Sequence, residues 1–129
     1  MDKREFSDIR HCLEKTQKQM AQLLGTSTKA IESFEQGWRN IPVHIERQVL
    51  FLLAGMTLKN QKRSVCWSIQ KCPTKVRKNC PAWEFQTGEF CWFINGTICH
   101  GEVQETWQKK MTMCRKCKVF MHKMPRLYD

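Results

Sequence analysis

The chain has 129 residues, which is enough for one ordinary domain or two small ones. Its 22 Lys and Arg residues outnumber its 12 Asp and Glu residues and give a formal net charge of +10, so a polyanionic partner is favoured over a merely solvated basic surface. No export signal or membrane span is visible, so we expect a cytoplasmic protein whose eight cysteines serve metal ligation or redox chemistry rather than a secreted disulfide framework.

The N-terminal half begins with two predicted helices. Apolar residues at helical spacing indicate the first, with a stripe formed by Phe6, Ile9 and either Cys12 or Leu13. A second helix is expected after Thr16, because Gln19 three residues later completes a capping-box pattern, and Gly25 ends it. Its buried side is expected to hold Met20, Ala21, Leu23 and Leu24.

The run TSTKAIESFEQG predicts a third helix directly after the second. Ser27 is the expected N-terminal cap, Ile31 and Phe34 form a buried pair, and Gly37 is the expected stop. Two short helices joined by a turn that contains glycine form a helix-turn-helix. In that motif the second helix carries short polar or basic side chains that reach base edges in the major groove.

The segment TQKQMAQLLGTSTKAIESFEQGWRNIP resembles the DNA-binding core of the phage-repressor, or XRE, helix-turn-helix family, over about residues 5 to 54. Thr26 stands where an aliphatic residue is common in that family. The resemblance implies that Gln17 contacts a phosphate, and a helix N-terminus suits an anion. The expected DNA-binding residues are Gln17, the recognition-helix residues Ser27, Thr28, Lys29 and Ser33, and the loop residues Trp38, Arg39 and Asn40.

A fourth helix is expected after Pro42, whose fixed φ suits a first turn. Its broad apolar face is formed by Ile45, Val49, Leu52 and Leu53. The additional apolar residues Phe51 and Met56 favour a homodimer on a palindromic operator, with packing against the cysteine-rich half as the alternative.

Seven cysteines follow residue 65, after a polar and basic segment. We therefore predict a helix-turn-helix domain at 1–58, a linker at 59–65, a cysteine-rich domain at 66–120 and a tail at 121–129. The expected fold class is mainly α: a four- to five-helix N-terminal domain and a small, irregular α+β domain that binds a metal or cluster.

The cysteine pattern contains one C-x-x-C pair, CRKC, which lets two thiolates converge on one metal from a single turn. Cys72 and Cys80 each precede proline, as in ferredoxin-like ligand loops. The candidate metal ligands are Cys66, Cys72, Cys80, Cys91, Cys99, Cys114 and Cys117. His100 and His122 are possible additional ligands, and the count of seven thiols leaves open whether there is a second centre.

The segments CWSIQKCP, CWFINGTIC and CRKC resemble the two-CW domain, a cysteine-rich module of bacterial and archaeal signalling and regulatory proteins, over residues 66 to 120. The resemblance implies a metal or iron-sulfur site and a sensory role. An iron-sulfur cluster of the 4Fe-4S type is favoured for two reasons. The main candidate ligands are all cysteines, and several aromatic residues could shield a cluster from solvent. Structural zinc and a metal-free thiol-disulfide switch are the alternatives.

We therefore expect a transcriptional regulator that binds double-stranded DNA and senses redox state, oxygen or metal. The competing interpretations are a constitutive DNA-binding protein with structural zinc and a thiol-redox or electron-carrier protein. The sequence does not favour an enzyme, because its histidines are scattered and no acid/base pair is assembled with them.

Overall fold

The computed structural model describes residues 1–58, 74, 80–84, 91–99 and 102–124. These residues are mainly helical, which confirms the mainly α fold class. The chain divides into two compact units, Met1–Met56 and Thr57–Asp129, which are described separately. Within the described ranges, no helix combines the length and the apolar character needed to cross a membrane. The predicted linker at 59–65 lies outside these ranges.

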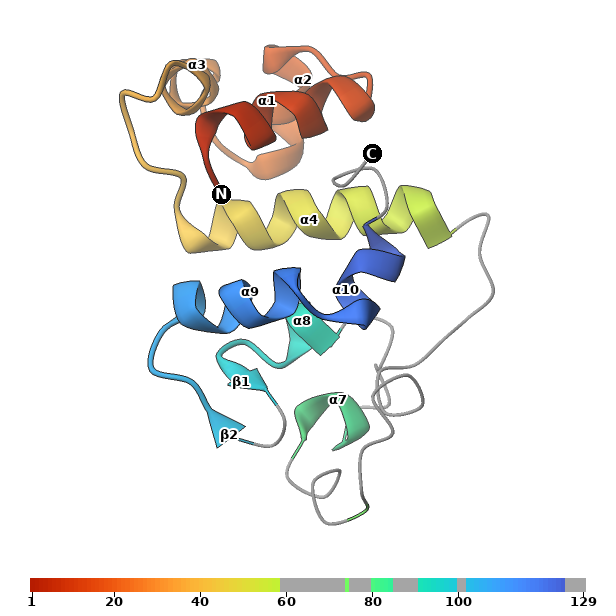
Figure 1. Cartoon of the computed structure of the whole chain (residues 1–129). Helices are drawn as coiled ribbons and strands as arrows, with labels where there is room; N and C mark the ends of the chain where they lie inside the picture. The colour runs from red at the N-terminus through yellow and green to blue at the C-terminus, as the bar shows by residue number, and fades with distance from the viewer. Residues whose placement is uncertain (59–73, 75–79, 85–90, 100–101, 125–129) are drawn as a thin grey trace. The chain divides into compact units, whose positions relative to one another are not determined.

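The first unit consists of helices (Figure 1). Their bounds are α1 Lys3–Cys12, α2 Gln17–Leu24, α3 Thr28–Gln36 and α4 Val43–Leu58, the last of which ends beyond the boundary of the unit. The α1 helix begins after Asp2, whose side chain accepts a hydrogen bond from the Glu5 N–H at 2.8 Å. The α3 helix packs against both α1 and α2. The Gln48 side chain of α4 donates to the Leu23 carbonyl at the end of α2.

Local signals place the ends of α2 and α3. The predicted capping box is confirmed, because Thr16 and Gln19 each accept a hydrogen bond from the other's backbone N–H. The Ser27 hydroxyl caps α3 by accepting from the Ala30 N–H at 3.1 Å. Gly25 and Gly37 end their helices with φ values of 67° and 80°, a left-handed conformation that glycine adopts without steric cost.

The core of the first unit contains most of the apolar residues expected from helical spacing, although Cys12, Leu13 and Leu52 are only half-buried. Phe6 and Phe34 meet edge to face, with ring centroids 5.8 Å apart. Leu23 was expected on the buried side of α2 but is 43% exposed. The α2 helix directs Met20, Ala21 and Leu24 inward, and the 100° step between successive residues turns Leu23 away from that face. On α4, buried residues occupy two adjacent rows: Ile45, Val49 and Leu53, and Glu46, Leu50 and Ala54.

The second unit is built from short elements (Figure 1). Their bounds are α7 Pro81–Glu84, α8 Cys91–Ile94, β1 Ile98–Cys99, β2 Glu102–Val103, α9 Trp107–Arg115 and α10 Lys118–Lys123. The two strands pair antiparallel, with Ile98 opposite Val103 and Cys99 opposite Glu102. Trp92 and Phe120 are both buried and meet edge to face at 6.1 Å. The α10 helix continues past residue 120, where the predicted domain ends.

Candidate nucleic-acid interface and thiol cluster

The α3 helix has one buried and one polar face. Ala30, Ile31 and Phe34 are buried against the rest of the first unit. The opposite face carries residues at i, i+3, i+4 and i+7 spacing, namely Lys29, Glu32, Ser33 and Gln36. Ser33 is half-buried and the other three are exposed. This polar stripe can donate and accept hydrogen bonds along two turns of the helix.

Two predicted DNA-binding residues lie at the start of α3. Ser27 is exposed and its hydroxyl oxygen is engaged by the Ala30 N–H, so it acts as the helix cap. Thr28 is the first residue of the helix and is half-buried. Both therefore lie at the positive end of the α3 dipole, which favours an anion such as a phosphate group.

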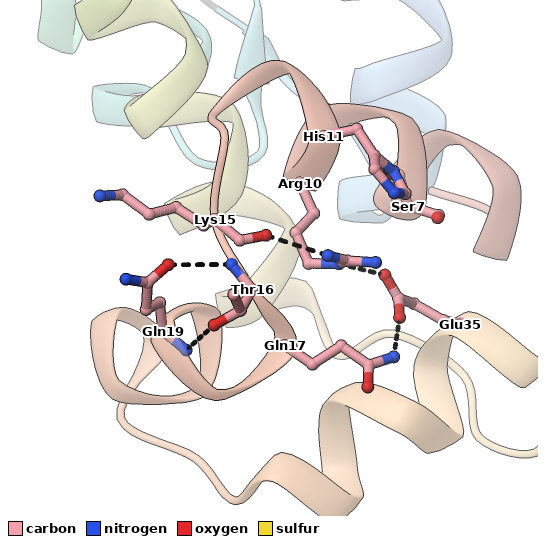
Figure 2. Close-up of polar contacts among 8 residues, drawn as sticks. All are labelled: Ser7, Arg10, His11, Lys15, Thr16, Gln17, Gln19 and Glu35. Atoms are coloured by element: carbon pink, nitrogen blue, oxygen red, sulfur yellow. Dashed lines mark hydrogen bonds and ion pairs between the residues drawn. The ribbon is translucent and has the colours of Figure 1, made fainter.

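A polar network connects the three helices around Glu35 (Figure 2). The Arg10 Nε of α1 donates to Glu35 Oε1 at 2.6 Å, and Arg10 Nη1 donates to the Lys15 carbonyl at 2.9 Å. The Gln17 side-chain amide of α2 donates to the second carboxylate oxygen of Glu35. Gln17, the predicted phosphate contact, is therefore directed toward α3 in this structure.

The loop after α3 carries the remaining predicted DNA-binding residues. Trp38, Arg39 and Asn40 are all exposed, and Trp38 is 76% exposed. The backbone N–H groups of Trp38 and Arg39 donate to the Ser33 carbonyl, which folds the loop onto the end of α3. The Arg39 guanidinium lies 5.7 Å from the centroid of the Phe34 ring.

Glu32 and Gln36 were not predicted as DNA contacts, although they share the polar stripe with Lys29 and Ser33. Their spacing along the helix could have identified them, because a face defined by Lys29 and Ser33 necessarily includes positions 32 and 36. A glutamate can accept from cytosine and a glutamine can pair with adenine in the major groove.

The predicted metal ligands lie on several elements of the second unit. Cys80 precedes α7, Cys99 is in β1, Cys114 lies in the last turn of α9, and Cys117 caps α10. Cys91 begins α8, and His122 is part of α10. Cys66, Cys72 and His100 lie outside the described residues.

The pKa of the Cys99 thiol is affected by three other thiols of the second unit. Burial is the largest cause that raises the pKa of Cys99 from 9.0 to about 11. Thiolate charge on Cys114, Cys117 and Cys80 acts in the same direction, whereas the Lys110 ammonium opposes it. We call Cys80, Cys99, Cys114 and Cys117 the thiol cluster.

Two hydrogen bonds attach polar groups to the thiol cluster. The buried Asn95 side chain donates to Cys80 Sγ at 3.5 Å. Lys110 forms a hydrogen bond with the Cys114 thiol and lowers its pKa, against the larger effect of burial, which raises the pKa. Lys110 was not predicted to take part in the site. Its position four residues before Cys114 on one helix face was the available signal, but its burial depends on tertiary packing.

Four thiolates are the donor chemistry of a zinc site or of an iron-sulfur cluster. The buried Trp92 Nε1 also has no acceptor among the described residues, so a donor is available in the same unit. Within the described ranges, however, no three His, Cys, Asp or Glu side chains are grouped so that they could hold a metal ion as they stand.

Comparison with protein-family models, curated proteins and solved structures finds no match for this chain.

Proposed function

We propose that this protein is a DNA-binding transcriptional regulator whose cysteine-rich unit binds an iron-sulfur cluster or a metal and senses redox state, oxygen or metal. In this proposal α2 and α3 form a helix-turn-helix of the phage-repressor type. The α3 helix enters the major groove of double-stranded DNA, and the state of the cysteine-rich unit alters that binding.

The observation that carries the DNA-binding proposal is the polar stripe of α3. A recognition helix needs one face that packs on its own domain and an opposite face that reaches base edges. The stripe lies opposite Ala30, Ile31 and Phe34, and it offers both donors and acceptors. The exposed loop residues Trp38, Arg39 and Asn40 extend the surface beyond the C-terminal end of α3.

The network around Glu35 supports the same proposal, because it fixes the position of α3. Glu35 receives hydrogen bonds from Arg10 on α1 and Gln17 on α2. A helix held by polar contacts from two others loses little conformational freedom when it binds, and preorganisation of this kind favours specific recognition.

The cysteine pattern of the second half, with its C-x-x-C pair, supports the metal-binding part of the proposal. An iron-sulfur cluster is the favoured cofactor, because the main candidate ligands are all cysteines and because a cluster suits a sensory role. Structural zinc is the second candidate, and the burial of Cys114 within a small unit favours it. Broad visible absorbance of protein purified without oxygen would select the cluster, whereas a colourless protein with bound zinc would select the second candidate.

We further propose that the protein acts as a homodimer on a palindromic operator. Phe51 and Met56 on α4 are 40% and 36% exposed, and a second copy of the chain could cover this apolar surface. One α3 helix reads only one half-site, and a two-fold dimer would place two such helices about 34 Å apart. Sedimentation at micromolar concentration should detect the dimer, and a strict monomer on and off DNA would contradict it.

The DNA-binding proposal is tested with duplexes selected by the intact protein from a random pool. Lys29→Ala and Ser33→Ala should each reduce discrimination between selected and unrelated duplexes by about 1 to 3 kcal/mol, because each removes a base contact. Arg39→Ala should weaken all duplexes similarly and reduce the salt dependence of binding, because it removes a phosphate contact.

Arg4→Ala is the matched control, since it removes an exposed positive charge from α1 and not from α3 or the loop that follows it. It should leave discrimination unchanged. If Lys29→Ala and Ser33→Ala also leave discrimination unchanged, α3 is not the recognition helix.

A further inference from the structure

The α3 helix carries two carboxylates whose surroundings differ. Glu35 accepts hydrogen bonds from Arg10 and Gln17, and its side chain is only 8% exposed. Glu32, three residues earlier, is exposed, and within the described part of the chain no hydrogen bond or ion pair engages its side chain. Glu35 therefore fixes the position of the helix, whereas Glu32 presents its negative charge to solvent.

Glu32 is the acidic residue of the polar stripe. Lys29 precedes it by three residues and Gln36 follows it by four, so the three side chains lie along one face of the helix. That face is opposite the buried Ala30 and Phe34. When α3 enters the major groove with this stripe toward the bases, Glu32 reaches the base edges between a lysine and a glutamine.

A carboxylate on this face opposes DNA binding unless it accepts a hydrogen bond. The phosphates carry negative charge, and an ionised carboxylate has no proton to donate to the acceptors of the major groove. Guanine presents two acceptors in that groove, and thymine presents an acceptor and a methyl group, so neither base offers a donor to Glu32. The donors in the groove are the amino groups of cytosine and adenine.

Of these two bases, cytosine suits Glu32 better. The N4 amino group of cytosine has no acceptor beside it, and glutamate is one of the side chains that accept from it. The N6 amino group of adenine lies beside the N7 acceptor, whose lone pair repels a carboxylate, so adenine suits an amide that both donates and accepts. Lys29, one turn earlier, can donate to guanine, the partner base of cytosine.

We propose that Glu32 is a specificity-determining residue that requires a cytosine in the sequence read by each α3 helix. The inference rests on the proposed DNA binding by α3 and names the class of duplex that this surface takes. A cytosine gives the carboxylate a hydrogen bond, whereas another base leaves it without a partner in a groove lined by phosphates. The same side chain therefore favours the correct duplex and rejects others.

The base preference is tested by selecting duplexes from a random pool with the full chain and with Glu32→Gln. This substitution keeps the length of the side chain and replaces its charge with an amide. The intact chain should select a cytosine at one fixed position in the sequence read by each α3 helix. Glu32→Gln should lose that cytosine and favour adenine, which an amide can pair with. A purely structural role of Glu32 would not change the identity of one selected base.

A second measurement compares the selected duplex with one in which that C·G pair is changed to T·A. The intact chain should bind the changed duplex about 5- to 150-fold more weakly, which is the usual discrimination by one base contact. Glu32→Gln should lose most of this difference. It should also bind unrelated duplexes more tightly, because it removes a negative charge from the face that approaches the phosphates.

Asp8→Asn is the matched control, because Asp8 is exposed on α1 and its replacement changes the net charge by the same amount. It should leave the selected sequence and the ratio of the two affinities unchanged. A gain in affinity for unrelated duplexes that is equal in both variants would come from net charge and would contradict a local role of Glu32.

The outcomes separate this inference from the proposed function. If the intact chain selects no common sequence, specific DNA binding itself fails, and the inference fails with it. If the intact chain selects a sequence that lacks a fixed cytosine, or if Glu32→Gln selects the same sequence as the intact chain, Glu32 is not the determinant while the DNA-binding function stands.

Discussion

At the residue scale, the thiols of the second unit combine burial with mutual repulsion. Burial is the larger cause for both Cys99 and Cys114, and it raises both pKa values. With a pKa of about 11, the Cys99 thiol keeps its proton at neutral pH in the metal-free chain. The form that ligates a metal is the thiolate, so loading must remove protons from this site.

The raised pKa of Cys99 determines how metal binding should depend on pH. A raised pKa favours the protonated, metal-free form, and raising the pH lowers the free-energy cost of removing each proton. Apparent zinc affinity should therefore increase from about pH 6 to pH 8, by about tenfold per pH unit for each proton released. An indicator dye in weak buffer should record the released protons. An affinity that is independent of pH in this interval would contradict the assignment of Cys99 as a ligand.

At the residue scale, the sequence predicted the helix ends correctly but did not predict the burial of individual side chains. Thr16, Ser27 and the glycines that end α2 and α3 were predicted correctly, because a helix end is determined by residues within one turn of it. The burial of Lys110 was not predicted, because its surroundings come from Trp92, which lies 18 positions earlier in the chain. From sequence alone a lysine is expected at the surface, and only the tertiary structure shows that this one is buried.

At the element scale, α1, α2 and α3 meet at one carboxylate. Glu35 accepts from Arg10 and Gln17, and the Glu35 and Arg10 side chains are only 8% and 14% exposed. Removing one partner of a buried ion pair leaves the other uncompensated, which is more costly than never having formed the pair. The geometry of α3 should depend on this contact.

Glu35→Ala should destabilise the first unit by about 3 kcal/mol, because it leaves the Arg10 guanidinium without its carboxylate partner. Hydrogen exchange of the α3 amides measures the effect on this unit in the full chain. Glu32→Ala is the control on the same helix, since Glu32 is exposed, and it should change stability by less than about 0.5 kcal/mol. Equal protection of the α3 amides in both variants would show that the network does not hold the helix.

Elements of the second unit were predicted only as an irregular α+β arrangement. Short strands such as β1 and β2 have two residues each, which is too few for an alternating pattern to identify them. The α7 and α8 helices have four residues each and lack the length for a helical apolar stripe. Their positions are set by contacts such as those of Asn95 and Trp92, which a single sequence does not display.

At the scale of the whole molecule, the chain joins two units within one helix, because α4 ends at Leu58 while the first unit ends at Met56. The net charge of +10 supplies an attraction to any nucleic acid that does not depend on sequence. Two kinds of binding can therefore be measured separately. If the proposed metal centre controls DNA binding, its loss should change the sequence-specific affinity and leave the nonspecific affinity in place.

The central claim is that the state of the thiol cluster controls specific DNA binding. Its most direct test is the affinity of the loaded protein for one selected duplex and one unrelated duplex, measured beside Cys114→Ser/Cys117→Ser and the chelated or oxidised protein. We expect affinity for the selected duplex to differ between the loaded and unloaded forms by about 5- to 150-fold, the usual range of coupling between two sites, with affinity for the unrelated duplex unchanged. Equal affinity and specificity in every form would contradict the claim and make the cysteine-rich unit a passive part of the fold.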